Sequence, residues 1–593
     1  MKRINSYLGV CALAGLLVSV GCSKNEDPET LDDAGQGGEE ADAGPQDPGP
    51  CDTTWKAVQR TIFEGRGCTE SACHGAKEKA GGLDLSPGVA YKNLVFADAE
   101  ASLSVPLYRI HPGEQALSLL YLKVAAAVDE EAKLPAGAGA PMPTGKAPLS
   151  ADQLAGLRLW IRAGAPETGV VEGTQELLGC DLPSEADPNR TIQPPVPDVE
   201  EGFQHASGTW TVPPDTDNEV CFATYYDLSD SAPDWARFPC ELNGDSHTCV
   251  GFKRRQLSQD AQSHHSIINV YTGSASPTDP SWGAWRCVGG DLDQKACDPT
   301  KLGVSASSGG ADCGADSACQ SAPVKSIACR GYGPTDRDLK SVGAGGAQSP
   351  VSSQRFPEGV YGQLPIKGII VWNSHGFNLT SKAADIGQFN TFWYARPNER
   401  TYLVRRIFDS RYIFTMTVPP FESREYCATF TLPRYANLAN ISSHAHKRGV
   451  LWRTWLPPNT PNCLPSAGCS PNAAPPDYVS KSYNDPLTID YSPALTFDGE
   501  DEASRTLKYC AVFDNGKDHA DLVKQRSKLL EGVNDCGSGQ TFCLDGANKG
   551  KACASDGDCP GSSCDACTVT GGFTTEDEMF ILLGDFFVVP PKP

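Results

Sequence analysis

From about residue 201 onward, apolar and polar residues alternate in short runs that are separated by turn residues. Examples are residues 218–228 (NEVCFATYYDL), 401–409 (TYLVRRIFD) and 411–418 (RYIFTMTV). Alternation with a period of two is typical of strands that bury one face, and short strands between turns are typical of sandwiches. Patterns with a helical period are scarce in this part of the chain. The sequence therefore predicts that this part is all β.

Residues 51–170 carry a different pattern. Cys68 and Cys73 precede His74 in the order C-x-x-x-x-C-H, a variant of the motif that attaches haem c covalently. Two such thiols can form thioethers to haem, while the following His takes an axial position on the iron. Met142, which stands between two prolines, is the expected sixth ligand, and His111 is a weaker candidate. The alternative is an ordinary Cys68–Cys73 disulfide with His74 incidental.

A helix is predicted at the end of this module. Ser150 and Gln153 form a capping box, and Leu154, Leu157 and Ile161 share one face before Gly164 ends the pattern. The module resembles the small α-helical cytochrome c-like domains of exported bacterial proteins. Cys51 and Cys180 flank it and are placed to join its ends. A Pro-rich linker is expected over residues 171–200.

The first 22 residues are typical of a secretory signal. Met1, Lys2 and Arg3 precede an apolar run, and small residues before Cys22 resemble a bacterial lipobox. We therefore expect a lipoprotein whose lipidated Cys22 anchors it to the outer membrane, facing the periplasm or the cell surface. The alternative is an ordinary cleaved signal. Residues 23–50 are acidic, rich in Gly and Pro and poor in apolar side chains, which predicts a disordered tether.

The cysteine count and the charge limit the compartment and the partners. The chain has 24 Cys, and 20 remain when Cys11, Cys22, Cys68 and Cys73 are set aside. An even number of Cys in an exported chain predicts disulfides, several of them in Gly-rich and Asp-rich insertions. The net charge of −23 argues against nucleic acid as a partner.

Five His and one late Met lie in strand-like apolar surroundings. Imidazole together with thioether is a ligand set that suits copper. His444 and His446 are two apart, so they would point to one face of a strand. His264 and His265 are adjacent, so joint ligation would require a bulge or a strand end. The third ligands expected are His375 for the adjacent pair and Met579 for the spaced pair. The alternative is that these His are surface or hydrogen-bonded core residues.

The order of these residues resembles the copper type II, ascorbate-dependent monooxygenases, the family of dopamine beta-monooxygenase and peptidylglycine alpha-hydroxylating monooxygenase. The resemblance rests on the His-His pair, the lone His, the His-x-His, the YCAVFDNG turn and the GGF…DEM segment, and it spans roughly two thirds of the chain. It implies two antiparallel β-sandwich, jelly-roll-like domains, expected at residues 201–397 and 398–593.

The family also implies two copper ions, one on either side of a solvent cleft. The ligands carried over for the electron-transfer copper are His264, His265 and His375. Those for the catalytic, oxygen-binding copper are His444, His446 and Met579. The implied partners are O2, a small-molecule substrate and an electron donor, either an ascorbate-like reductant or a periplasmic redox partner.

Departures from the family pattern bear on the substrate. Peptide-amidating members hold a substrate carboxylate at positions that here are Ser442, Ile581 and Leu583. Leaving a carboxylate unpaired against such a wall would be costly, so peptide amidation is not expected. The family also tends to bond the Cys after the Met ligand to the Cys of the YC strand. Here Phe580 follows Met579, so Cys510 must pair elsewhere or stay free.

These observations together predict an exported copper-dependent monooxygenase that hydroxylates a C–H bond of a small substrate with O2. The attached haem c domain would be a source of electrons. Two alternatives remain open at this point. One is a non-catalytic copper and haem lipoprotein for electron transfer or surface binding, and the other is a structural adhesin in which the His bind a different metal.

Overall fold

The structure is a computed structural model that describes residues 51–591, apart from 100–102, 104–105, 129–133, 189–192, 215, 302–311, 315–316, 379, 460–474, 482, 484–485, 529–535, 537–538 and 575. The described residues belong to one compact unit, Gly49–Pro593. The expected signal peptide, the lipidated Cys22 and the acidic tether lie outside them. Within the described ranges, no helix has the length and apolar character needed to cross a membrane.

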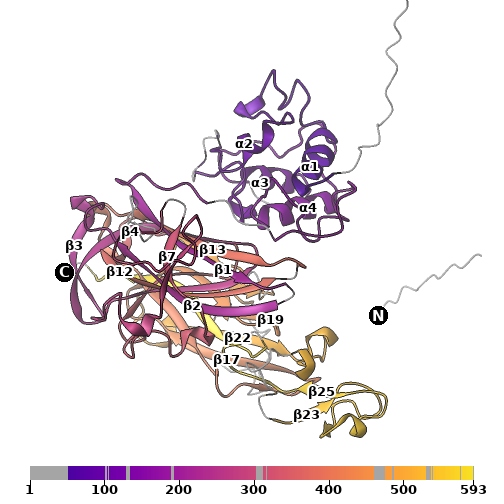
Figure 1. The fold of residues 1–593 in the computed structure, drawn as a ribbon, viewed down its shortest axis with the longest axis vertical. Coiled ribbons are helices and arrows are strands. Elements are labelled where there is room, and N and C mark those ends of the chain that lie inside the picture. Colours follow the sequence, from indigo (N-terminus) through magenta and orange to yellow (C-terminus); the bar gives the residue numbers. More distant parts are fainter. Residues whose placement is uncertain are drawn as a thin grey trace, which may run out of the picture. The chain divides into compact units, whose positions relative to one another are not determined.

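The α-helices lie in an N-terminal module (Figure 1). Its elements are α1 (Thr54–Ala57), the π-helix η1 (Val58–Glu64), η2 (Ala80–Gly82), α2 (Ala90–Leu94), η3 (Gln115–Leu117), α3 (Leu119–Ala125) and α4 (Ala151–Arg162). Helix α4 begins with the predicted capping box, in which the Ser150 side chain accepts from Gln153 N. Leu157 and Ile161 of α4 are fully buried. Gly164 follows the helix with a φ of 89°, so the predicted start and end of this helix are confirmed.

The module continues beyond the end expected at residue 170. Val171 and Leu178, which fall in the expected linker, are buried in the same apolar cluster as α1 and α4. Cys180 forms a disulfide with Cys51, as expected, and Cys51 N donates to Asp181 O at 3.1 Å. Residues 171–182 are therefore part of the folded module, because their apolar side chains complete its core.

The next residues form two antiparallel sheets. The first sheet has the order β1 (Gly202–Val212), β13 (Ala384–Tyr394), β4 (Asp245–Gln259), β11 (Val360–Pro365) and β14 (Tyr402–Leu403), with β3 (Arg237–Leu242) and β10 (Val351–Arg355) also paired to β4. The second has the order β6 (Trp285–Val288), β7 (Ala318–Ser321), β2 (Thr216–Asp227), β12 (Lys367–Asn378), β5 (Ser263–Tyr271) and β9 (Ser341–Ala347), with β8 (Val324–Lys325) paired to β2.

Apolar side chains from both sheets meet in one core, so the pair forms a β-sandwich. Phe252 and Phe392 of the first sheet and Phe222, Ile268 and Trp372 of the second are all less than 4% exposed in that core. Strand β14 begins after the boundary expected at residue 397, yet it pairs in parallel with β11. The first sandwich therefore extends to about residue 403.

The second sandwich contains two four-stranded sheets. One has the order β15 (Arg405–Ser410), β27 (Ile581–Val588), β18 (Ala436–His444) and β21 (Ile489–Phe497), and the other β17 (Ser423–Thr431), β22 (Thr506–Asp514), β19 (Gly449–Trp455) and β20 (Tyr478–Ser480). Smaller pairings join β16 (Thr417–Val418) to β26 (Val569–Thr570), and β23 (Thr541–Cys543) to β24 (Ala552–Cys553) and β25 (Cys564–Cys567). Ile407, Leu438 and Leu582 of one large sheet meet Tyr509 and Phe513 of the other in its core. The expectation of a mostly β fold with two sandwiches after a helical module is confirmed.

Short 3₁₀ turns connect the strands. They are η4 (Asp234–Ala236), η5 (Pro280–Trp282), η6 (Ile327–Cys329), η7 (Pro397–Glu399), η10 (Ala503–Arg505), η11 (Ala520–Leu522), η12 (Arg526–Lys528) and η13 (Asp556–Asp558).

Strand β27 joins the second sandwich to the first. Phe587 belongs to the apolar core of the first sandwich, and its ring centroid lies 5.8 Å from that of Tyr402. Asp585, also on β27 and only 7% exposed, accepts from Gln354 of β10 and lies 3.9 Å from Arg255 of β4. A buried aromatic side chain and a nearly buried polar cluster therefore hold the two sandwiches against each other.

Disulfides cross-link the loops between strands. Two of them, Cys287–Cys313 and Cys297–Cys319, close the insertion in the first sandwich, and three more, Cys536–Cys567, Cys543–Cys559 and Cys553–Cys564, close the insertion around β23. Cys221–Cys329 and Cys240–Cys249 lie in the first sandwich. This density of disulfides places the protein outside the cytoplasm, in an extracellular or periplasmic compartment.

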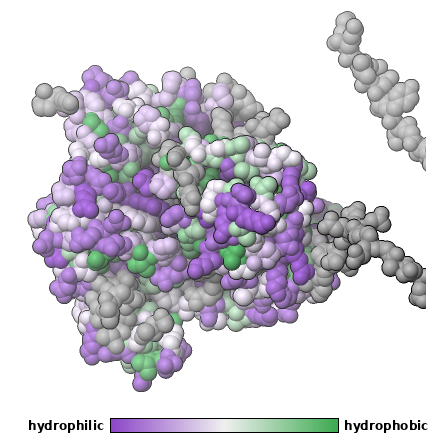
Figure 2. Space-filling view, turned by 90° about the horizontal axis from the view of Figure 1, so that it is seen from above, coloured by the Kyte–Doolittle hydropathy of each residue, from purple (hydrophilic) through white to green (hydrophobic). Residues whose placement is uncertain are grey.

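The face drawn in Figure 2 is mainly hydrophilic, with small and separate hydrophobic patches. Scattered patches of this kind are normal for a folded domain.

Candidate metal centre

The first ligand set lies on two neighbouring strands of the first sandwich. His375 of β12 is opposite His265 of β5, and the next residue of β12, Gly376, is opposite Ser263. His264 is therefore the extra residue of a β-bulge, as its adjacency to His265 required. The bulge turns both side chains toward His375. The ring centroids lie 5.4 Å apart for His264 and His265, 5.1 Å for His264 and His375, and 4.8 Å for His265 and His375.

The facing nitrogens of this set are close enough to share one cation. Nδ1 of His375 lies 3.4 Å from Nδ1 of His265, and one nitrogen from each of the three rings lies within 4.8 Å of the others. All three side chains are less than 8% exposed. Three convergent imidazoles in a buried pocket form a site that suits copper, zinc, iron or nickel.

The second ligand set lies at one end of the second sandwich. His444 is the last residue of β18, whereas His446 lies in the turn that leads to β19. This differs from the expectation that both lie in a strand, but the rings still converge, with centroids 5.1 Å apart. Met579 stands two residues before β27, and its Sδ lies 3.3 Å from Nε2 of His444. The Met thioether is the feature that favours copper over the harder metals.

A hydrogen bond orients the ring of His446. Its Nδ1 lies 3.0 Å from the Asp577 carbonyl oxygen, so Nδ1 carries the proton and donates. Its Nε2 is buried and has no hydrogen-bond partner among the described residues. A histidine that donates one ring proton to a carbonyl, leaves the other nitrogen bare and has a second imidazole beside it has the arrangement of a metal ligand. The residues present therefore fit a copper ion at this set.

Burial favours the neutral form of four of these imidazoles. It lowers the pKa of His264, His265 and His444 well below the usual value, and the neighbouring imidazoles lower it further. Burial also lowers the pKa of His446 to about 4. A neutral imidazole offers the lone pair that metal binding requires.

The two sets are neighbours. The ring of His265, from the first sandwich, has its centroid 6.3 Å from that of His444, from the second. Tyr483 of the second sandwich also approaches the first set, with its ring centroid 6.0 Å from that of His264. The family resemblance implies a solvent cleft between two separate sites, and the structure differs from it in this respect.

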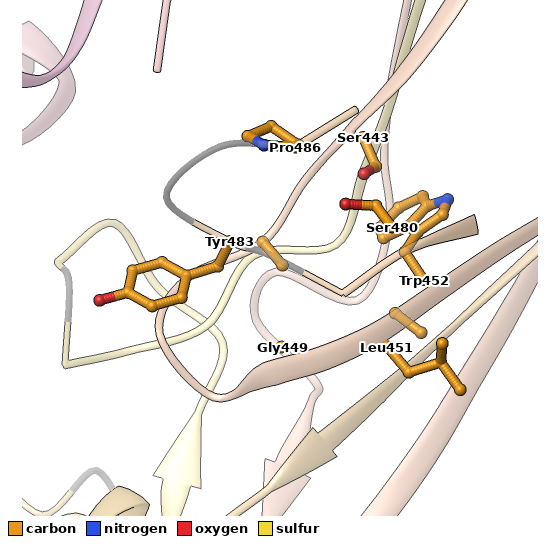
Figure 3. Close-up of a pocket in the computed structure, with 9 residues that line it drawn as sticks. Ser443, Gly449, Leu451, Trp452, Ser480, Tyr483 and Pro486 are labelled. Atoms are coloured by element: carbon orange, nitrogen blue, oxygen red, sulfur yellow. The ribbon is translucent and has the colours of Figure 1, made fainter. Parts of the chain in front are cut away.

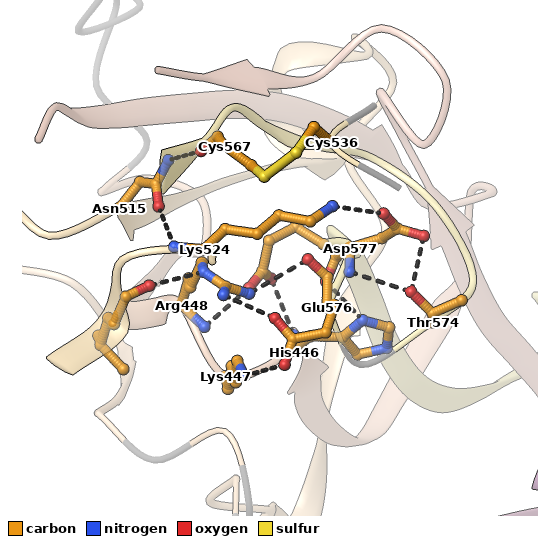
Figure 4. Close-up of polar contacts among 12 residues, drawn as sticks. His446, Lys447, Arg448, Asn515, Lys524, Cys536, Cys567, Thr574, Glu576 and Asp577 are labelled. Carbon is orange, nitrogen blue, oxygen red and sulfur yellow. Dashed lines mark hydrogen bonds and ion pairs between the residues drawn. A yellow bond between two sulfur atoms is a disulfide. The ribbon is translucent and has the colours of Figure 1, made fainter. Parts of the chain in front are cut away.

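A buried polar network, which the sequence analysis did not single out, holds the second set (Figure 4). Glu578 is fully buried, and its carboxyl oxygens accept from His446 N at 3.0 Å and Arg448 N at 2.7 Å. Burial raises the pKa of Glu578 to about 8. Arg448 in turn donates to Glu576 Oε2 at 2.8 Å and to the Leu522 carbonyl at 2.7 Å. The network ties the His446 turn to the segment that carries Met579. The signal in the sequence was the run of three acidic residues, Glu576 to Glu578, shortly before the apolar strand β27.

We expect Glu578→Gln to weaken copper binding at the second set about 10-fold to 100-fold, the usual effect of removing a partner that orients a ligand. The amide retains one acceptor and turns an NH2 group toward a backbone N–H, so one buried donor loses its partner. The measurement is copper retained per chain against increasing chelator. Glu500→Gln, at a side chain 85% exposed in the same sandwich, is the matched control and should retain copper as the parent does. Equal retention by Glu578→Gln and the control would contradict this role.

A small hollow of about 10 Å³, enough for about one water molecule, lies in the second sandwich (Figure 3). Its walls are formed by Ser443, Ala445, Gly449, Leu451, Trp452, Ser480, Tyr483, Pro486 and Ala511. Ser443 and Ala445 precede and follow His444 in the chain, but His444 itself does not line the hollow, because neighbouring residues of a strand point to opposite faces. The Ser443 hydroxyl is already paired with Tyr478 Oη at 2.8 Å. The described lining contains no charged side chain.

The positions that would hold a carboxylate in amidating enzymes lie side by side here. Leu583 is opposite Ser442 and Ile581 is opposite His444 in the pairing of β27 with β18. Cys510 pairs with Cys427 across β22 and β17. Phe580 is fully buried in the core of the second sandwich against Tyr509, with ring centroids 4.9 Å apart.

The structure leaves Cys68 and Cys73 as thiols, not as a disulfide. Burial raises the pKa of the Cys68 thiol. The ring of His74 hydrogen-bonds through Nδ1 to the Ala80 carbonyl at 2.9 Å, so its Nε2 is left for another partner. Lys146, on the loop that carries Met142, forms an ion pair with Glu70 between the two Cys. Two thiols, an oriented imidazole and a neighbouring Met loop fit the attachment of haem c.

His111 is placed elsewhere in the module. It is 2% exposed, and its Nδ1 donates to the Pro112 carbonyl at 2.9 Å. Its ring packs against the rings of Phe96 and Tyr108, and the centroid distances are 5.5 and 5.6 Å. These contacts are those of a core histidine.

Comparisons with known proteins add little. No family model matches the chain, and no curated protein matches it. Among solved structures, the major capsid protein P2 from bacteriophage PM2 is 7% identical over 62% of this chain and 99% of that one, with a TM-score of 0.17. The STIV MCP is 9% identical over 53% and 96%, with a TM-score of 0.16. Scores this low carry no argument about function, so the copper monooxygenase resemblance stays a prediction from the motifs.

Proposed function

We propose that this protein is an exported copper-dependent monooxygenase that hydroxylates a C–H bond of a small, uncharged substrate with O2. The first copper would be held by His264, His265 and His375. The second, catalytic copper would be held by His444, His446 and Met579. Copper bound at these sets supplies the redox chemistry for activating O2 and for storing an electron.

The observation that carries the proposal is the contact of a thioether with an imidazole at the second set. Met579 Sδ lies 3.3 Å from Nε2 of His444, beside a second imidazole whose free nitrogen is buried. A soft sulfur ligand favours the cuprous state, which is the state that reacts with O2. A site of three imidazoles alone would leave the choice of metal open.

The surroundings of the second set support an uncharged substrate. Ser442, Ile581 and Leu583 offer no positive charge for a carboxylate, and the small hollow nearby has no charged side chain in its described lining. This lack of charge at the described positions is what favours an uncharged substrate.

The reaction consumes two electrons and two protons for each O2, placing one oxygen atom in the product and the other in water. The electrons would come from an ascorbate-like reductant, from a periplasmic redox partner or from haem c held by Cys68, Cys73, His74 and Met142. Lipidation at Cys22 would anchor the protein to the bacterial outer membrane.

The test is oxygen incorporation by the purified, copper-loaded protein. Uncharged small molecules are incubated with ascorbate under 18O2, and products are identified by mass spectrometry. We expect a hydroxylated product that carries one 18O atom, formed only with copper present. Copper that is reduced and reoxidised without any labelled product would favour the non-catalytic electron-transfer alternative.

We expect His264→Ala to remove one of two coppers and leave the other, because the three ligands of the second set remain complete. Copper per chain is measured after dialysis against a weak chelator. His519→Ala, at an exposed histidine of the second sandwich, is the matched control and should keep both ions. Loss of both metals together, or a single copper in the parent, would contradict the assignment of two sets.

A further inference from the structure

The five imidazoles and the thioether form one continuous cluster. Within each set, ring centroids lie 4.8 to 5.4 Å apart. Between the sets, the ring centroids of His265 and His444 lie 6.3 Å apart. The distance between rings of different sets is therefore only about 1 Å longer than the distances between rings of one set. The contact between Tyr483 and His264 is a second point at which the second sandwich approaches the first set.

Contacts away from the cluster fix this arrangement. Phe587 is inserted in the apolar core of the first sandwich, and Asp585 is held by Gln354 and lies beside Arg255. Asn440 of β18 also donates to Asp585, at 3.3 Å. Strand β18 pairs with β27 and ends at His444, so the strand that presents His444 is tied to the first sandwich through Asp585 of β27.

We infer that the two ligand sets build a single dinuclear copper centre, in which the two ions are direct neighbours and interact magnetically. The inference rests on the ligand assignment of the proposed function, but not on turnover. In such a centre an electron passes between adjacent imidazole ligands of the two ions, and no solvent-filled gap separates donor from acceptor.

Electron paramagnetic resonance of the protein loaded with two Cu(II) ions tests the inference. Dipolar interaction falls with the cube of the distance between spins, so neighbouring ions broaden each other's lines and give a half-field transition. We expect both features in the parent protein and in the control His519→Ala. In the single-copper variants His264→Ala and Met579→Leu, we expect the half-field transition to disappear and the lines to sharpen to those of one isolated ion.

Two outcomes would overturn the inference. One is a parent protein with two coppers whose spectrum is the unbroadened sum of the two single-copper spectra. The other is a parent protein that binds one copper only. A coupled spectrum in a protein that forms no 18O-labelled product would leave the dinuclear centre standing and refute the monooxygenase, so the two proposals fail by different measurements.

Discussion

Replacing Met579 with histidine is expected to leave copper bound and to abolish most of the oxygenation. The thioether lies 3.3 Å from Nε2 of His444 and is the only soft donor in the set. Exchanging sulfur for nitrogen stabilises the cupric state, and reaction with O2 requires the cuprous one. Removing an outer partner of a metal ligand typically costs about 10-fold to 100-fold, so we expect the loss of the ligand itself to exceed about 100-fold in labelled product.

The chain offers a matched control for this change. Met416 lies in the apolar core of the same sandwich and is 1% exposed. Met416→Leu keeps nearly the same volume, so it should retain both copper and turnover. Copper per chain is measured beside product yield with excess reductant. Unchanged turnover in Met579→His would make Met579 an ordinary core residue.

Local features of the structure could be predicted from the sequence wherever a short pattern decides them. The adjacency of His264 and His265 required a bulge, because neighbours in a regular strand point to opposite faces, and the bulge is present. The capping box at Ser150 and Gln153 was also predictable, because its two hydrogen bonds join residues that are only three positions apart in the chain.

Features that depend on contacts between distant segments could not be predicted in the same way. No local pattern sets how β27 packs on the first sandwich, so the approach of His444 to His265 appears only in the structure. Residues 171–182 contain no proline and were placed in the Pro-rich linker by position alone, yet Val171 and Leu178 complete the core of the helical module. Their burial depends on partners more than 100 positions earlier in the chain.

The polar residues that support the second set were missed for a related reason. Glu578 and Arg448 resemble surface charges in a sequence, because isolated charged residues are usually exposed. In the structure Glu578 accepts two backbone N–H groups, and Arg448 is 1% exposed and paired with Glu576. A charged residue next to a ligand is buried when it has such partners, and only the fold supplies them.

The double change Cys68→Ser and Cys73→Ser is expected to remove haem from the protein completely. Covalent haem c depends on thioether bonds, and in the described structure these two are the cysteines that remain outside disulfides. The parent, produced in a host competent in haem attachment, should be red and should stain for haem in a denaturing gel. Met142→Ala is the matched control, because it should change the spin state and lower the reduction potential while the thioethers keep the haem in the gel.

If the haem module supplies electrons to the copper centre, the double variant should lose turnover driven by a reduced cytochrome partner and keep turnover driven by ascorbate. A colourless parent protein would contradict haem attachment and leave the copper centre to be reduced by ascorbate or another external donor.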